Sequence, residues 1–307
     1  VLLLPVERAG ELNRRYDTVV CTGVLHHLAD PDAGLQALRE ALEPGGAVHL
    51  MVYAPFGRAG VYLLQEYSRR LGIGTSSQEI RELAASLQGL PPDHPLVPLL
   101  QKAPDFRREE ALADALLNPR DRPYSVPQLL GFIEGAGLRF GRWLRQAPYL
   151  PQCGAWASSP HRALLERLPV QEQYAAAELF RGTMARHSAI VYRPDEGGNS
   201  QLIDFEGGWW SGFVPIRLPG TLAVEERLPP GAAAVLINPS HTYTDIYLPI
   251  DAEEKRMIDT IDGKRTILEI LEMALPGARE ARRLEVGSAF FQRLWWYDQV
   301  VFDASGV

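Results

Sequence analysis

The sequence predicts an α/β protein built on a mainly parallel sheet, followed by a small α+β domain. Residues 18–21 and 47–53 are apolar, β-branched runs typical of buried strands, and the segment between them has a helical pattern. A strand, a helix, a turn and a second strand in this order form a βαβ unit, which makes the two strands parallel. The composition changes after the polar, glycine-rich run 194–200. We therefore predict an α/β domain with helical insertions over 1–193, a linker over 194–200 and a second domain over 201–307.

The composition places the chain among ordinary globular proteins. Of its 307 residues, 46% are hydrophobic and 22% are charged. No apolar run approaches the roughly 20 residues that cross a bilayer, so we expect no membrane partner. The two cysteines do not form a disulfide framework, which favours a cytoplasmic location. The net charge of −7 argues against nucleic acid as the main partner. The first residue is Val1 in a strand-like run, so we expect the N-terminus to be truncated.

The first 54 residues contain clear element boundaries. Val1–Leu4 is a short apolar strand candidate, and Arg8–Arg15 has the pattern of a short polar helix. Asp30 is a candidate N-cap, because Pro31 follows it at the first helical position. The helix is expected to present Leu35, Leu38 and Leu42 on one face and to stop at Pro44-Gly45-Gly46.

The rest of the first domain is predicted to be largely helical. A helix over 58–71 places Val61, Leu64 and Tyr67 on one face. Residues 72–120 are predicted as a helical insertion interrupted by a proline-rich stretch. The remaining expected elements are helices over 125–136 and 162–181 and strands over 138–145 and 187–192.

One motif resembles a known family. The segment Tyr16-Asp17-Thr18-Val19-Val20-Cys21-Thr22-Gly23-Val24-Leu25-His26-His27-Leu28 is similar to the fourth-strand region of class I methyltransferases of types 11 and 12. Asp30-Pro31 and Pro44-Gly45-Gly46 match the helix and the turn that follow it there. Residues 138–140 and 187–192 look like the antiparallel pair that closes the family's sheet. The resemblance implies a Rossmann-like methyltransferase sheet and S-adenosylmethionine (AdoMet) as the cofactor.

The same resemblance implies which residues face the cofactor. In open parallel sheets, ligands bind beyond the carboxyl ends of the strands. Pro5-Val6-Glu7 and Cys21-Thr22-Gly23 both follow expected strands. Carried over by position, the cofactor-binding residues are Val6, Glu7, Cys21, Thr22, Gly23 and His26.

The sequence departs from the family at the glycine-rich loop. Class I methyltransferases hold the methionine and ribose parts of the cofactor with a loop after the first strand, where glycines permit close backbone approach. No Gly-x-Gly-x-Gly occurs in this sequence. We therefore expect an incomplete sheet at the N-terminal side, with open strand edges and poor cofactor binding by this chain alone.

His26 and His27 have several possible roles. They could line the cofactor pocket, support the structure or supply a general base, with His27 the candidate base. We expect no metal, because no Asp, Glu or His at ligand spacing accompanies them. Cys21 is expected to be a buried small hydrophobe.

Other polar side chains have structural and functional interpretations that the sequence does not separate. Arg58 and the tyrosines 53, 62 and 67 could meet an acceptor or simply pack between helices. Glu178, Arg181 and His187 could belong to an active-site lid. The run Arg120-Asp121-Arg122 is predicted to be a solvated turn.

The second domain is expected to contain helices over 251–261, 266–274 and 286–297, with strands over 221–227, 233–238 and 299–302. The pattern Ile258-x-x-Ile261-Asp262-Gly263-x-Arg265-Thr266 resembles small winged-helix peptide-recognition proteins. This domain holds 10 Lys and Arg against 16 Asp and Glu, a net charge of −6, which disfavours DNA binding. The resemblance implies a peptide or protein partner. Four tryptophans, 209, 210, 295 and 296, are expected in its core or in a docking face.

The leading hypothesis is an AdoMet-dependent methyltransferase acting on a small-molecule or peptide-borne acceptor. The alternative is a non-catalytic methyltransferase fold that binds a partner through its C-terminal domain.

Overall fold

The computed structural model describes residues 3–102, 108–195 and 203–306. It divides into two compact units, one of residues 1–144 and 174–200, the other of residues 145–173 and 201–307. The sequence assigned 145–173 to the first domain, whereas these residues group with the second unit. Residues 196–200 of the predicted linker lie outside the described part of the chain. No described helix has the length and apolar character needed to span a membrane.

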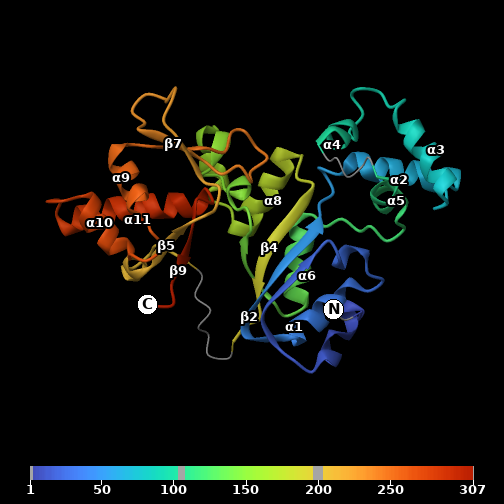
Figure 1. Cartoon of the computed structure of the whole chain (residues 1–307), viewed down its shortest axis with the longest axis horizontal. Coiled ribbons are helices and arrows are strands. Elements are labelled where there is room, and N and C mark those ends of the chain that lie inside the picture. Colours follow the sequence, from blue (N-terminus) through green and yellow to red (C-terminus); the bar gives the residue numbers. More distant parts are fainter. Residues whose placement is uncertain (1–2, 103–107, 196–202, 307) are drawn as a thin grey trace. The chain divides into compact units, whose positions relative to one another are not determined.

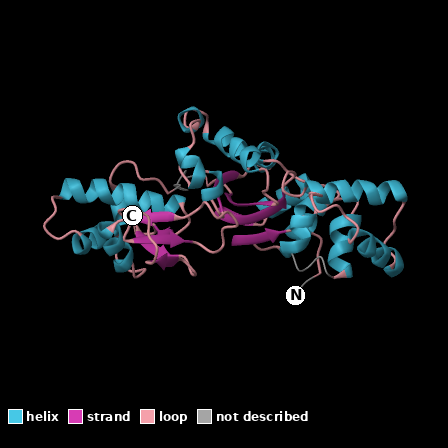
Figure 2. Ribbon diagram, turned by 90° about the horizontal axis from the view of Figure 1, so that it is seen from above, coloured by secondary structure: helices cyan, strands magenta, loops and turns pink. Residues whose placement is uncertain are grey.

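A four-stranded sheet forms the centre of the first unit (Figures 1 and 2). Its strand order is β1-β2-β4-β3, where β1 is Tyr16–Thr22, β2 is Leu42–Tyr53, β3 is Arg139–Trp143 and β4 is Arg186–Tyr192. β1 and β2 run parallel, while β4 is antiparallel to both β2 and β3. The predicted α/β class, the βαβ unit and the closing antiparallel pair are therefore confirmed.

Strand β1 differs from the expected buried strand. Cys21 is its one buried residue, and the side chain of Val20 is 67% exposed. The reason is topological, because β1 lies at the end of the strand order and pairs with β2 alone among the described strands. The predicted strand at the start of the chain is also wrong for its described part, since Leu3 and Leu4 are not in a strand. A 3₁₀ helix, η1 (Val6–Leu12), follows and packs through Ala9 on the next helix.

Helix α1 (Pro31–Glu40) begins as the sequence predicts. The carboxylate of Asp30 accepts a hydrogen bond of 2.9 Å from the backbone N–H of Ala33, and Pro31 occupies the first turn. Leu35 and Leu38 are buried. Leu42, expected on the same helical face, instead begins β2, because the helix ends two residues earlier and the strand continues through the Pro-Gly-Gly turn.

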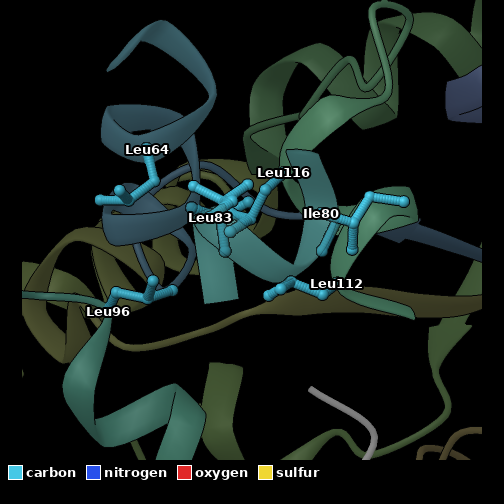
Figure 3. Close-up of a cluster of buried hydrophobic side chains, with 8 residues drawn as sticks. Leu64, Ile80, Leu83, Leu96, Leu112 and Leu116 are labelled. Carbon is cyan, nitrogen blue, oxygen red and sulfur yellow. The ribbon is translucent and has the colours of Figure 1, made fainter. Parts of the chain in front are cut away.

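Four helices form a compact insertion beyond the carboxyl end of β2 (Figure 1). They are α2 (Ala59–Leu71), α3 (Ser77–Leu87), α4 (Val97–Lys102) and α5 (Glu109–Leu117). Their leucine-rich core is shown in Figure 3 and contains Val61, Leu64, Ile80, Leu83, Leu96, Leu112, Ala115 and Leu116. Gly60 lies so close to the chain just before α4 that an added Cβ would stand 2.2 Å from the backbone nitrogen of Leu96. Tyr67, predicted to share the buried face of α2, is 45% exposed.

The remaining helices of the first part of the chain include α6 (Val126–Gly135) and α8 (Val170–Arg181), with a short α7 (Arg162–Leu165) before α8. Glu178 of α8 is buried, and its carboxylate contacts Nε2 of His187 at 2.9 Å. The same carboxylate accepts a hydrogen bond of 2.8 Å from the backbone N–H of Val126. These contacts fasten α8 to β4 and α6, and the suggestion that Glu178 and His187 belong to a lid stays a prediction.

The second unit combines short strands with helices. β5 (Val214–Arg217) pairs with β9 (Val300–Asp303), and β6 (Leu222–Val224), β7 (Ala234–Ile237) and β8 (Leu248–Ile250) form a three-stranded antiparallel sheet. After residue 201 the helices are α9 (Ala252–Thr260) and α10 (Ile267–Ala274), close to their predicted bounds, and α11 (Glu280–Trp296), which begins well before the predicted start at residue 286. Of the four tryptophans after residue 201, Trp210 is buried, and Trp209, Trp295 and Trp296 are half-buried. The winged-helix resemblance and the partner it implies stay predictions.

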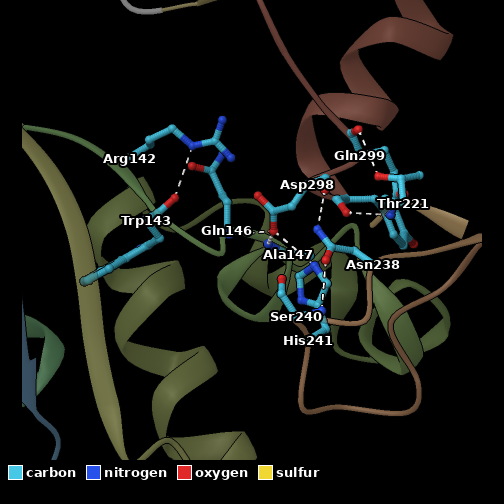
Figure 4. Close-up of polar contacts among 11 residues, drawn as sticks. Arg142, Trp143, Gln146, Ala147, Thr221, Asn238, Ser240, His241, Asp298 and Gln299 are labelled. Carbon is cyan, nitrogen blue, oxygen red and sulfur yellow. Dashed lines mark hydrogen bonds and ion pairs between the residues drawn. The ribbon is translucent and has the colours of Figure 1, made fainter. Parts of the chain in front are cut away.

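Asp298 organises the polar interior of the second unit (Figure 4). Its Oδ2 accepts hydrogen bonds from the backbone N–H groups of Gln146, at 2.8 Å, and Ala147, at 3.0 Å. The same oxygen lies 3.3 Å from Nε2 of His241. The side-chain amide of Asn238 donates to the backbone carbonyl of Asp298 at 2.6 Å. This aspartate thus fixes two separate segments through main-chain groups.

Candidate functional site

The site is built where the parallel strands β1 and β2 end side by side. Thr22, the last residue of β1, is aligned with Met51 of β2. The next residue, Gly23, turns the chain with a φ of +76°, a conformation that glycine adopts at little cost. Its backbone N–H donates to the carbonyl of Met51 at 3.2 Å. The turn thus directs the following residues across the carboxyl edge of the sheet.

A stack of rings follows this turn. His26 and His27 lie in a short 3₁₀ helix, η2 (Leu25–His27). The His26 ring is fully buried, and its centroid lies 4.2 Å from that of His27 and 4.2 Å from that of Tyr53, the last residue of β2. Leu25, the first residue of η2, is also fully buried. The two strand ends are therefore joined by packed imidazole and phenol rings.

A cation is held against this stack. The guanidinium carbon of Arg58 lies 3.6 Å from the centroid of the Tyr53 ring, a cation–π arrangement. Arg58 also forms an ion pair with Asp121 at 3.0 Å, and both side chains are almost completely buried. Gln65 of α2 donates to the same carboxylate oxygen at 3.0 Å. Because a buried charge is costly without a partner, this ion pair links α2 firmly to the loop that carries Asp121.

The loop between α5 and α6 closes over the strand ends. The backbone N–H of Arg122 donates to the carbonyl of His26 at 3.1 Å, and that of Tyr124 donates to the carbonyl of Tyr53 at 2.9 Å. At the start of the loop, Nδ2 of Asn118 lies 3.0 Å from Nδ1 of His27. The loop is thus fixed to both η2 and the end of β2.

Burial determines the protonation states in the site. Burial, with smaller effects from His27 and Arg58, lowers the pKa of His26 to about 3. Burial also raises the pKa of Tyr53, and raises the pKa of Tyr62 to about 12. The pKa of the Cys21 thiol rises to about 11 for the same reason. At neutral pH the site therefore contains a neutral His26, protonated phenols and a protonated thiol.

Three side chains of this cluster lie close enough together to form a possible metal site. His26, His27 and Asp121 can each offer one ligand atom, and these atoms lie within 4.8 Å of one another. A divalent cation there would stand beside the Arg58 guanidinium, which already shares the Asp121 carboxylate. The chemistry of this donor set does not favour a dication, and the expectation of no metal stays a prediction.

The predicted cofactor residues fall into two groups. Thr22, Gly23 and His26 lie at the carboxyl edge of the sheet, with Cys21 buried in the strand just before them. Val6 and Glu7 lie in η1, half-buried and exposed respectively, and no strand precedes them among residues 3–5. The argument that they follow a strand end therefore does not hold.

Sequence reasoning missed the polar partners of the ring stack. Asp121 was predicted in a solvated turn, but its side chain is fully buried against Arg58. No sequence pattern had indicated a role for Asn118 or Gln65. Arg58 and Asp121 are 63 residues apart, so no local pattern connects them. The signal that was available is the presence of charged residues on both segments that flank the carboxyl end of β2.

Comparisons with known proteins agree with this arrangement. A family model described as "Methyltransferase domain" matches residues 3–48, the segment that contains β1, η2 and α1. The tRNA U34 carboxymethyltransferase of Campylobacter curvus is 42% identical over 48 residues, which is 16% of this chain and 16% of that protein. The chain therefore contains a segment that is similar to a methyltransferase domain. Two residues of the ring stack, His26 and His27, lie within this segment.

Longer alignments support the fold. PKMT2 from Rickettsia typhi matches with a TM-score of 0.62 over 97% of this chain and 60% of that one, at 13% identity, and has also been solved in complex with AdoHcy. An uncharacterized protein of Synechococcus sp. is 32% identical over 237 residues, covering 71% of this chain. The chain spans 57% of the length of that relative.

Proposed function

We propose that this methyltransferase chain contributes to AdoMet-dependent methyl transfer to a small-molecule or peptide-borne acceptor. The observation that carries the proposal is the joined carboxyl edge of β1 and β2, where Gly23 turns the chain and His26 packs on Tyr53. Ligands of open parallel sheets bind at such edges. The family model over residues 3–48 and the AdoHcy complex of PKMT2 support AdoMet as the cofactor.

In this proposal the chain aligns the reactants and excludes water. A lone pair of the acceptor atom forms a bond to the sulfonium methyl carbon, and the electron pair of the breaking carbon–sulfur bond stays on sulfur. AdoMet thereby becomes the neutral thioether S-adenosylhomocysteine, and an acceptor that began as an anion becomes neutral. Such a displacement depends chiefly on alignment of the two reactants, which can lower the activation barrier by about 7–11 kcal/mol. Residues at the strand ends would provide it.

The cofactor contacts proposed here are Thr22 and Gly23, because His26 is fully buried by protein and packs on Tyr53. The sequence contains no Gly-x-Gly-x-Gly loop to hold the methionine and ribose parts. We therefore propose that this chain binds AdoMet weakly and that a longer protein, extended upstream, binds it well.

The test is calorimetric titration with S-adenosylhomocysteine of this chain and of the upstream-extended protein. Binding by the extended protein, with weaker binding by the chain, is the expected result. Gly23→Ala in the extended protein should weaken binding about tenfold, or about 1.4 kcal/mol, because the turn at the strand end is displaced. Gly72→Ala is the matched control, since Gly72 has a similar φ of +66° at the end of α2 with nothing near its Cβ position.

Two results would contradict the proposal. If both proteins are folded and neither binds, the methyl-transfer function fails and a non-catalytic role takes its place. If Gly72→Ala weakens binding as much as Gly23→Ala, the effect comes from backbone strain alone and the site has been misplaced.

A further inference from the structure

Asn118 has different partners at the two ends of its side-chain amide. Its Oδ1 accepts a hydrogen bond of 3.0 Å from the backbone N–H of Arg120. Its Nδ2 lies 3.0 Å from Nδ1 of His27. Asn118 is half-buried at the end of α5, where the loop that covers the strand ends begins.

These two contacts determine the position of a proton. A backbone N–H can only donate, so the amide atom facing Arg120 has to be the oxygen, and the amide cannot be flipped without losing this bond. The amide nitrogen therefore faces His27, and it too can only donate. Nδ1 of His27 has to accept this hydrogen bond, which requires a lone pair on Nδ1. In a neutral imidazole the proton is then on Nε2.

We propose that Asn118 is a positioning residue that holds neutral His27 as its Nε2–H tautomer, so that His27 offers a hydrogen-bond donor and not a base through Nε2. The assignment of the tautomer depends only on the contacts of Asn118 with Arg120 and His27. The role of this tautomer in methyl transfer rests on the proposed function. There, His27 would orient an acceptor oxygen or nitrogen by donating to it, and would not remove its proton.

The groups around His27 agree with a site that takes no proton from the acceptor. His26 is a very weak base, because burial lowers its pKa to about 3. Tyr53 and Tyr62 keep their protons, since burial raises the pKa of both phenols. Asp121 is engaged by Arg58. The chemistry favours an acceptor that arrives with its nucleophilic lone pair already free, such as a carboxylate.

The same tautomer bears on metal binding. Coordination of a metal through Nε2 of His27 would require the ring proton on Nδ1. That proton would face the donor Nδ2 of Asn118 and the hydrogen bond would be lost. The hydrogen bond from Asn118 therefore also disfavours metal binding by His26, His27 and Asp121.

The proposal is tested by nitrogen NMR of the full chain at a pH of about 8. Long-range proton–nitrogen correlations distinguish protonated from unprotonated ring nitrogens, and the signals lost in His27→Gln identify the ring. We expect Nδ1 of His27 in the range of an unprotonated nitrogen and Nε2 in the range of a protonated one. A proton on Nδ1 overturns the proposal.

A variant tests whether Asn118 is the cause. Asn118→Asp keeps an oxygen for the Arg120 N–H but replaces the donor facing His27 with an acceptor, so the His27 proton should move to Nδ1. If the proton stays on Nε2 in a folded variant, Asn118 does not set the tautomer and the proposal fails. If the variant does not fold, the wild-type spectrum still decides. Because no cofactor is needed, a chain that fails to bind S-adenosylhomocysteine can still confirm or overturn the tautomer.

Discussion

Asp121 in the first unit and Asp298 in the second are both buried, with side chains 0% and 2% exposed. Asp121 is bound by side chains, the guanidinium of Arg58 and the amide of Gln65. Asp298 is bound chiefly by the main chain, through the N–H groups of Gln146 and Ala147. A carboxylate that caps backbone amides fixes the chain path. One that neutralises a buried cation beside aromatic rings also sets the charge of a site.

The two aspartates also differ in which buried group is left without a partner when one member of the contact is removed. Loss of Arg58 would leave Asp121 as an uncompensated buried charge, which is among the most costly defects in a folded protein. Loss of the Asp298 carboxylate would leave two neutral N–H groups without acceptors. The expected effects therefore differ in size and in the way they can be rescued.

The largest expected effect is that of Arg58→Met. It should lower the free energy of unfolding by about 3–5 kcal/mol, measured by urea denaturation, because Asp121 stays buried without its counter-charge. The double variant Arg58→Met with Asp121→Leu should recover much of this loss. Arg69→Met is the matched control, since Arg69 pairs with Glu66 at the surface and its removal should have a far smaller effect. A double variant no better than the single one would show that the ion pair is not the source of the loss.

The next effect concerns Asp298. Asp298→Ala should cost about 2–3 kcal/mol in the same denaturation measurement, because the N–H groups of Gln146 and Ala147 lose their acceptor. Asp298→Asn should cost clearly less, since its amide oxygen can still accept and asparagine tolerates the φ of 53° at this position. Equal losses in the two variants would mean that charge, and not the capping of the main chain, is what matters at Asp298.

The smallest of the three effects is acid sensitivity from His26. Its pKa is about 3 in the folded protein and close to 6.5 in the unfolded chain, so below pH 6.5 the unfolded state binds more protons. Stability from this group is present above pH 6.5 and is lost as the pH falls toward 3. Between pH 7 and 5 the loss should be about 2 kcal/mol, because each pH unit below the unfolded pKa costs roughly 1.4 kcal/mol.

His26→Phe is the matched variant, because it keeps a ring against Tyr53 and removes the titrating group. Urea denaturation at pH 7 and at pH 5 should show a smaller decrease for the variant than for the wild type. Parallel decreases would mean that His26 gains its proton in the folded state at an ordinary pH, and the neutral, buried site described above would be wrong.

The sequence by itself determined the local structure. Asp30 before Pro31 fixed the start of α1, because a carboxylate caps the first turn and proline suits it. The β-branched run at residues 18–21 and the apolar run at 47–53 identified β1 and β2, and their spacing made them parallel. Thr22, Gly23 and His26 were candidates because the family resemblance implies cofactor contacts at the carboxyl end of β1.

Only the tertiary structure decided what those elements meet. Burial of β1 depends on its neighbours in the sheet, so its residues alone misidentified an exposed edge as a buried strand. The ion pair of Arg58 with Asp121 and the contact of Asn118 with His27 join residues 63 and 91 positions apart. Such contacts arise from packing between distant segments, and no periodicity or spacing encodes them. The chemistry of the site, including the position of one proton on His27, therefore had to be read from the folded chain.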